Sequence, residues 1–213
     1  MTDDRQVVAA FDVDGTLTTR DCVRPFLQRV GGRSGMVMSV LRTPAVSLMA
    51  AVRRDRDAVK AIVVGGVMRG RRVADVEDEG QRFARFVAER WIRPDTAARL
   101  RWHQRQGHRT VLVSASLGSY LRPLGATLGV DAVICTEVRQ SSGVFTDQLD
   151  GPNCRAAEKQ LRLERWFAEQ SLVDPTLWAY GDSAGDRQLL GMATFPNLVK
   201  GTAISEVPIE RAA

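Results

Sequence analysis

The chain has 213 residues, of which 44% are hydrophobic and 26% charged, as in an ordinary soluble globular domain. This composition excludes a fibrous repeat and a long disordered chain. The formal net charge of +5 could suit nucleic acid or an anionic membrane surface. However, the basic residues are mostly arginines scattered among acids, so a small anionic substrate fits the charge equally well, and we expect no nucleic-acid partner.

The first predicted element is the apolar run VVAAF, residues 7–11, which is typical of a short buried strand. Residues 18–92 then carry apolar side chains at helical spacing, interrupted by glycines and by Pro44. No strand pattern occurs in this segment. We therefore expect an all-helical insertion, with methionines 36, 38 and 49 in its core.

Beyond Pro94 the pattern changes to strands that alternate with helices. A helix should begin after Asp95 as N-cap. His103 and His108, which flank the end of this helix, should lie on the surface. Later elements are predicted as strands at 110–114, 132–136, 177–181 and 193–199, helices before Gly129, at 155–170 and at 186–192, and a hairpin at 137–149. This alternation favours an α/β fold, a Rossmann-like parallel sheet core with helices on both faces.

Cysteine usage and hydropathy indicate the compartment. Cys22, Cys135 and Cys154 are odd in number and widely spaced, which favours neither a disulfide framework nor a metal site. The N-terminus is polar and acidic, unlike a signal peptide. The most apolar stretch, residues 36–52, contains Arg42 and Pro44 and is too short to span a membrane. We expect a cytoplasmic protein without stable membrane insertion, and the oligomeric state is not predicted.

Polar side chains that can do chemistry follow the predicted strands. They are Asp12, Asp14, Ser114, Asp182 and Asp186, with Lys159 on a nearby helix. The carboxyl ends of parallel strands form the ligand-binding edge of such a sheet, so these groups should meet in one crevice. Clustered carboxylates without thiolates favour Mg²⁺, and the hydroxyl and ammonium groups suit phosphate oxygens. The residues thus describe a Mg²⁺-dependent phosphoryl-transfer site.

Four segments in order, FDVDGTLT, VLVSAS, the lysine of GPNCRAAEK and YGDSAGD, resemble the four motifs of the haloacid dehalogenase-like (HAD) hydrolases. The sequences of these motifs are most similar to those of the phosphoserine-phosphatase-like branch, subfamily IB. The resemblance implies a core domain of residues 1–17 and 93–213 and a helical C1 cap of residues 18–92.

The same resemblance implies roles for the site residues. Asp12 would be the nucleophile and Asp14 the general acid and base. Mg²⁺ would be held by the Asp12 carboxylate, the Asp14 main-chain carbonyl and Asp182, with Asp186 in support. Ser114 and Lys159 would bind the phosphoryl group. The implied activity is hydrolysis of a small phosphorylated metabolite.

Several of these residues have other interpretations. Ser114 could simply end a strand, Lys159 could lie in solvent, and Asp186 could cap the following helix. For Ser116 we favour a capping role over a catalytic one.

At three places the sequence differs from the phosphoserine phosphatases that it resembles. At the position of their substrate-binding glutamate this chain has Asp21, Gly185 replaces an asparagine, and SAS at 114–116 replaces Ser-Gly-Gly. Phosphoserine should therefore be a poor substrate. Other possibilities are a phosphotransferase or mutase with the same intermediate, a non-catalytic binding module, and a lipid-phosphate phosphatase whose segment 36–52 touches a membrane.

Overall fold

The computed structural model describes residues 6–41, 44, 48–49, 52–53, 55–199, 201, 203–205 and 207. Its core is a five-stranded sheet in the order β3-β2-β1-β6-β7, in which every neighbouring pair is parallel. The strands are β1 (Val7–Phe11), β2 (Arg109–Leu117), β3 (Ala132–Thr136), β6 (Thr176–Gly181) and β7 (Phe195–Leu198). The predicted α/β fold is confirmed.

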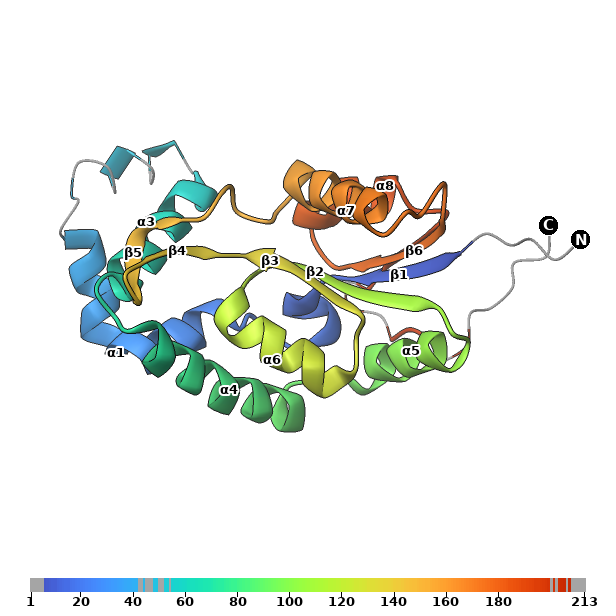
Figure 1. Cartoon of the computed structure of the whole chain (residues 1–213), viewed down its shortest axis with the longest axis horizontal. Coiled ribbons are helices and arrows are strands. Elements are labelled where there is room, and N and C mark those ends of the chain that lie inside the picture. Colours follow the sequence, from blue (N-terminus) through green and yellow to red (C-terminus); the bar gives the residue numbers. More distant parts are fainter. Residues whose placement is uncertain are drawn as a thin grey trace, which may run out of the picture.

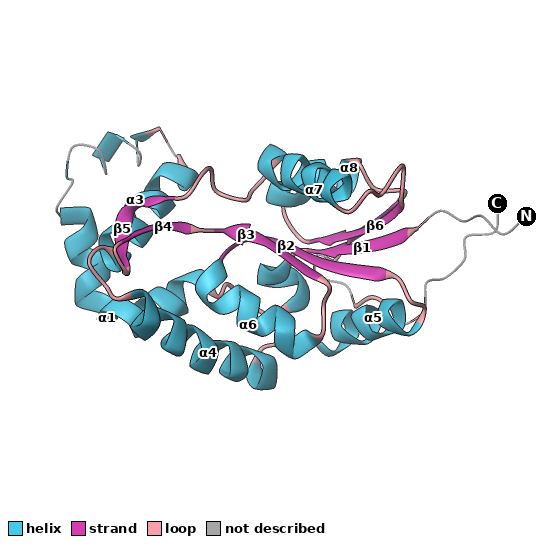
Figure 2. Ribbon diagram, viewed as in Figure 1, coloured by secondary structure: helices cyan, strands magenta, loops and turns pink. Residues whose placement is uncertain are grey.

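Helices cover both faces of this sheet. Figure 2 shows α5 (Pro94–Arg105) and α6 (Gly118–Leu128) on one face, and α7 (Ala157–Glu169) and α8 (Arg187–Gly191) on the other. β1 lies in the middle because four of its five residues are fully buried and apolar. Its partners are β2 on one side and β6 on the other, so the chain order reverses beside β1. A crevice at the carboxyl end of β1 follows from that reversal.

The described part of residues 18–92 includes the helices α1 (Val23–Leu41), α3 (Arg56–Met68) and α4 (Val73–Arg90). They lie beyond the carboxyl ends of the strands in Figure 1, together with the hairpin of β4 (Val138–Ser141) and β5 (Val144–Leu149). The hairpin is joined to this helical layer by main-chain bonds, Gly70 N to Phe145 O at 2.8 Å and Val73 N to Gly143 O at 3.0 Å. A segment from the second half of the chain thus completes the helical layer.

The two connections between the sheet and the helical layer run side by side. Thr19 N donates to Trp91 O at 2.8 Å, and Arg93 N donates to Leu17 O at 2.9 Å. The incoming and outgoing chains are therefore paired where the helical layer is covalently joined to the core.

The prediction for the first turn of α5 was wrong. The N-cap is Arg93, with Pro94 in the first helical turn, and the Asp95 carboxylate instead pairs with Arg93 at 2.8 Å. Proline suits the first helical position because its missing N–H has no partner there in any case. His103 was also placed wrongly: it is fully buried, and its Nε2 lies 2.8 Å from the hydroxyl of Tyr180.

The methionine prediction holds only in part. Met36 is partly buried and packs against the core, whereas Met38 is 48% and Met49 53% exposed. The buried position on this part of α1 belongs to Ser39 instead. In the part of the chain that the structure describes, no helix combines the length and the apolar character needed to cross a bilayer.

Candidate active site

The loop after β1 brings the first two carboxylates to the sheet edge. Asp12 N still donates to Tyr180 O at 2.9 Å, and Val13–Leu17 then form a wide turn. Gly15 in this turn has φ +85°, and a Cβ there would lie 2.4 Å from a carboxylate oxygen of Asp182. Only glycine therefore lets the loop after β6 approach the loop after β1 so closely.

Three carboxylates from two loops form a cluster at this edge. One oxygen each of Asp12, Asp182 and Asp186 can be chosen so that all lie within 4.8 Å of one another. Asp12 and Asp186 are buried. Asp186 begins α8 without a side-chain cap bond to it, and its carboxylate accepts from Ser183 N at 3.1 Å and Ser183 Oγ at 2.8 Å.

Lys159 places an ammonium group against this cluster. Its Nζ lies 2.5 Å from Asp12 Oδ1 and 2.6 Å from Asp186 Oδ1. The residue is only 2% exposed, so the interpretation of Lys159 as a solvated side chain is wrong. The two carboxylates raise the pKa of Lys159 against the effect of burial, and Lys159 stays charged. Burial raises the pKa of Asp12 to about 7, although Lys159 acts to lower it.

The charges in the cluster fit a divalent cation. The three carboxylates lie within 4.8 Å of one another, and the Lys159 ammonium contacts two of them. A divalent cation bound here would reduce the repulsion between carboxylates held so close together. All three donors are hard carboxylate oxygens, the ligand type that Mg²⁺ prefers. The chemistry of the donor set therefore agrees with the predicted metal.

Asp14 belongs to a different set of contacts. Its Oδ1 accepts from Cys22 N at 2.9 Å, and its Oδ2 accepts from Ser116 Oγ at 2.6 Å. Ser116 in turn accepts from the hydroxyl of Tyr120 at 2.6 Å. Burial raises the pKa of Asp14, and the bond from Ser116 lowers it by a smaller amount. The capping prediction for Ser116 was wrong, because Leu117 is the N-cap of α6 and Ser116 is engaged with Asp14.

Ser114 and Asp21 each have a hydrogen-bond partner close by in the sequence. Ser114 is buried, and its Oγ accepts from Ser116 N at 3.1 Å. The strand continues past it to Leu117 with an irregular register, so Ser114 does not end β2. Asp21 is exposed, and its carboxylate accepts from Val23 N at 3.4 Å and Arg24 N at 3.2 Å.

Sequence reasoning missed Lys60 and Asn153. Lys60, from α3, donates to Ala115 O and, at 2.5 Å, to Asn153 Oδ1. Burial lowers the pKa of Lys60 to about 8. Lys60, Asn153, Asp14 and Asp21 all line one cavity of about 660 Å³ between the helical layer and the core. No pattern in the helical segment distinguishes Lys60, since one lysine in an amphipathic helix normally faces solvent.

A parallel sheet with helices on both faces and carboxylates gathered at its carboxyl edge defines an α/β protein with its candidate active site at that edge. A family model described as haloacid dehalogenase-like hydrolase matches residues 9–191, and the chain belongs to that family. Among curated proteins it is 36% identical over 189 residues to Protein CicA of Caulobacter vibrioides, covering 88% of this chain and 83% of the relative.

Solved structures show the same fold. A Bordetella pertussis Tohama I protein described as of unknown function aligns with TM-score 0.69 at 20% identity, covering 89% of this chain and 88% of that one. A substrate-bound phosphoserine phosphatase aligns with TM-score 0.62 at 15% identity, covering 90% and 84%. A phospho-aspartyl intermediate analogue of phosphoserine phosphatase aligns with TM-score 0.60 at 16% identity, covering 89% and 84%.

Proposed function

We propose that this protein is a Mg²⁺-dependent phosphatase that hydrolyses a small organic phosphate monoester through an aspartyl-phosphate on Asp12. The observation that carries the proposal is the contrast between two neighbouring carboxylates. Asp12 faces an ammonium group and two further carboxylates, whereas Asp14 faces a hydroxyl and a main-chain N–H. Lys159 favours the anionic form of Asp12 against the effect of burial, whereas Asp14 has no cation among these hydrogen-bond partners. An ionised nucleophile beside a group that can carry a proton is the pair that this chemistry needs.

The two half-reactions follow from these environments. A carboxylate oxygen of Asp12 forms a bond to phosphorus while the ester P–O bond breaks, and Asp14 gives its proton to the departing alcohol. Asp14 then takes a proton from water as the water oxygen attacks phosphorus. Phosphate leaves and Asp12 is restored, so the proton count closes over one turnover.

The remaining residues neutralise charge and hold the phosphoryl group. Mg²⁺ would be bound by the Asp12 carboxylate, the Asp14 main-chain carbonyl and Asp182, with Asp186 in support. Its contribution is to offset the repulsion between the anionic substrate and the Asp12 carboxylate. Lys159 and Ser114 would donate to phosphoryl oxygens, and the contacts of Lys159 with Asp12 and Asp186 place its ammonium beside the nucleophile.

The division of the chain belongs to the same proposal. Residues 1–17 and 93–213 form the core domain, and residues 18–92 form a C1 cap over the active site. The paired connections at Leu17–Arg93 and Thr19–Trp91 support this boundary. Three unpaired cysteines support a reducing, cytoplasmic compartment.

Phosphoserine is expected to be a poor substrate. Asp21, which stands where a phosphoserine phosphatase has its ammonium-binding glutamate, already accepts two N–H groups at the start of α1. A substrate ammonium would have to compete with those bonds. The shorter side chain adds a further loss, since it reaches less far into the cavity.

The test is a panel of sugar, amino-acid, nucleotide and lipid monophosphates with Mg²⁺, alongside an aryl phosphate. We expect phosphate release that disappears in excess EDTA and returns when Mg²⁺ is added back. Transfer of phosphate to an added alcohol, without net release, would instead assign the protein as a phosphotransferase. Turnover that persists in excess chelator would remove the metal from the proposal.

A further inference from the structure

The second half of α1 carries its large apolar side chains outward. Gly32, with φ +68°, interrupts the helix, and the following turns run beside α3. A Cβ on Gly66 of α3 would lie 2.2 Å from the Cβ of Ser39, so the two helices touch through small residues. Ser39 is 2% exposed, whereas Val37 is 59% and Leu41 62% exposed. The helix therefore offers an apolar surface where a solvated polar face would be expected.

This apolar surface is continuous with the active-site cavity. The cavity of about 660 Å³ that contains Asp14 and Lys60 shares lining residues with a second one of about 690 Å³. The shared residues are Arg24, Met36 and Val63. The second cavity is otherwise lined by Gln28, Arg33, Val37, Val40 and Leu41. A groove thus leads from Asp14 along α1 and α3 to the outer end of the helical layer.

The lining of the groove changes from polar to apolar along its length. Its inner end holds Asp14, Lys60 and Asn153. Farther out the wall is built by aliphatic side chains, namely Val23, Leu27, Met36, Val59, Val63 and Val64.

The acids on the rim are already bonded within the protein. Asp21 accepts from the first turn of α1, Asp55 caps α3, and Asp57 accepts from Asn153 at 2.6 Å. Each of these carboxylates therefore has a structural role within the protein that does not require a cationic ligand.

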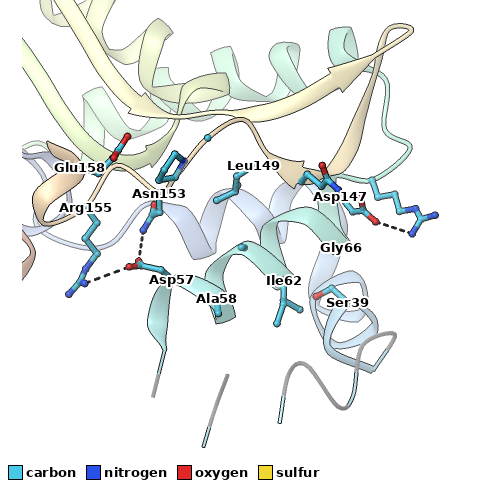
Figure 3. A pocket seen from close by; sticks show the side chains of 15 residues that line it. Ser39, Asp57, Ala58, Ile62, Gly66, Asp147, Leu149, Asn153, Arg155 and Glu158 are labelled. Carbon is cyan, nitrogen blue, oxygen red and sulfur yellow. Dashed lines mark hydrogen bonds and ion pairs between the residues drawn. The ribbon is translucent and has the colours of Figure 1, made fainter. Parts of the chain in front are cut away.

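A third cavity, of about 720 Å³, lies on the other side of α3 (Figure 3). Its polar groups are paired with one another, Asn153 with Asp57 at 2.6 Å and Arg69 with Asp147 at 3.1 Å. Neither Asp12 nor Asp14 lines it. This third cavity also meets the active-site cavity, but through the polar residues Asp57, Asn153 and Arg155. The groove past Met36 and Val63 is therefore the apolar route to the cavity that contains Asp14.

We propose that the groove binds the leaving group of the substrate, and that this leaving group carries an aliphatic chain of at least several methylenes. The proposal rests on the phosphatase function proposed above and names its substrate class, an amphiphilic phosphate monoester. The polar inner end holds the phosphate and the ester oxygen, and the aliphatic wall removes the chain from water. Arg24 and Arg33 on the rim suit an anionic lipid surface, from which such a substrate could be drawn.

The test is a series of straight-chain alkyl phosphates from ethyl to decyl, each kept below its micelle-forming concentration, with an aryl phosphate as reference. Each methylene that enters the groove should raise kcat/KM about two- to threefold, chiefly through KM. Aryl phosphate turnover with a flat alkyl series would overturn the inference and leave the phosphatase function in place.

A binding experiment covers the case in which no phosphate monoester is hydrolysed. If no monoester is hydrolysed but octylphosphonate binds at least tenfold more tightly than ethylphosphonate, the groove is upheld and the proposed reaction fails. Equal binding of the two phosphonates would overturn the groove independently of any turnover.

Two groove variants and one control locate the effect. Val63→Asn, at the junction of the two cavities, should lower the ratio of octyl to ethyl kcat/KM by about tenfold or more. Val40→Asn, on an exposed part of the groove where misfolding is not expected, should lower the ratio for the longest chains only. Leu161→Asn, at a 55% exposed position on α7, should leave every ratio unchanged. Equal effects of the three substitutions would overturn the assignment.

A vesicle experiment separates the two sources of such a substrate. A long-chain monophosphate diluted into phosphatidylcholine vesicles should be hydrolysed, and Val40→Asn should slow that reaction, if the chain is drawn from a bilayer. Hydrolysis of dispersed monomers alone would uphold the groove and assign a soluble amphiphile as the substrate. Failure of both forms, with the aryl phosphate still hydrolysed, would overturn the proposal.

Discussion

Asp12 and Asp14 are two residues apart and of one chemical type, yet they lie in opposite surroundings. Asp12 has an ammonium group at 2.5 Å and shares a cluster with two more carboxylates. Asp14 has no cation among its hydrogen-bond partners in the described part of the chain, which are Ser116 and Cys22 N. Burial acts on both, but only at Asp12 does an ion pair oppose it strongly. In the proposed mechanism the environment, and not the residue type, gives Asp12 the role of nucleophile and Asp14 the role of acid and base.

Asp12→Asn removes one of the two contrasted carboxylates and should have the largest effect. An amide of the same size cannot attack phosphorus, so turnover should fall by at least about 10⁴-fold. The fold should persist, and in metal-free protein the melting temperature should match or exceed that of the parent because one repelling carboxylate is gone. Parent-like rates in this variant would refute the covalent intermediate. A lost melting transition would instead show that Asp12 is needed for folding.

Asp14→Asn tests the other half of the comparison. We expect a loss of roughly 10²- to 10⁴-fold, because a general acid and base typically contributes that much. The loss should be greater for an alkyl phosphate than for 4-nitrophenyl phosphate, since an alkoxide needs the proton and nitrophenolate does not. Equal losses for both leaving groups would remove the acid role from Asp14.

Lys159→Met removes the ammonium that distinguishes the Asp12 cluster and keeps most of the side-chain volume. Orthovanadate and phosphate should bind more weakly by about 2 to 3 kcal/mol, the typical worth of a charged hydrogen bond. Inhibition constants for the parent, Lys159→Met and Lys159→Arg measure this. The arginine variant should regain part of the affinity. Unchanged constants in Lys159→Met would restrict this lysine to a structural ion pair.

The smallest effects should come from the hydroxyls that hold Asp14. Ser116→Ala deletes the bond to Asp14 and should lower kcat by about tenfold, with KM for an aryl phosphate little changed. Tyr120→Phe keeps Ser116 and should cost about two- to threefold. Ser119→Ala, the same change three residues further along, in the first turn of α6, is the matched control. A larger effect from Ser119→Ala than from Ser116→Ala would contradict the positioning role of Ser116.

Several features were readable from the chain because they depend on local pattern. A buried apolar run ending in Asp12-Val13-Asp14-Gly15 predicts a strand followed by a tight loop, and the parallel sheet then places every strand-end residue at one edge. For that reason Asp12, Asp182 and Asp186 could be expected together, and the structure gathers them within 4.8 Å. The hairpin at β4–β5 and the stop of α6 at Gly129 followed from glycine placement in the same way.

Only the tertiary structure decided which partner each of these groups meets. Ser116 reaches Asp14 across 102 positions in the chain and Lys60 reaches Asn153 across 93, and no spacing rule connects such residues. His103 was predicted at the surface because it lies near the end of a helix, and it is buried because Tyr180 supplies a partner from another element. On α1 the small residue Ser39 faces inward because Gly66 lies opposite, which turns Val37 and Leu41 outward. Local pattern determines where a strand or helix begins and ends, whereas the close approach of two elements determines which of their faces is buried.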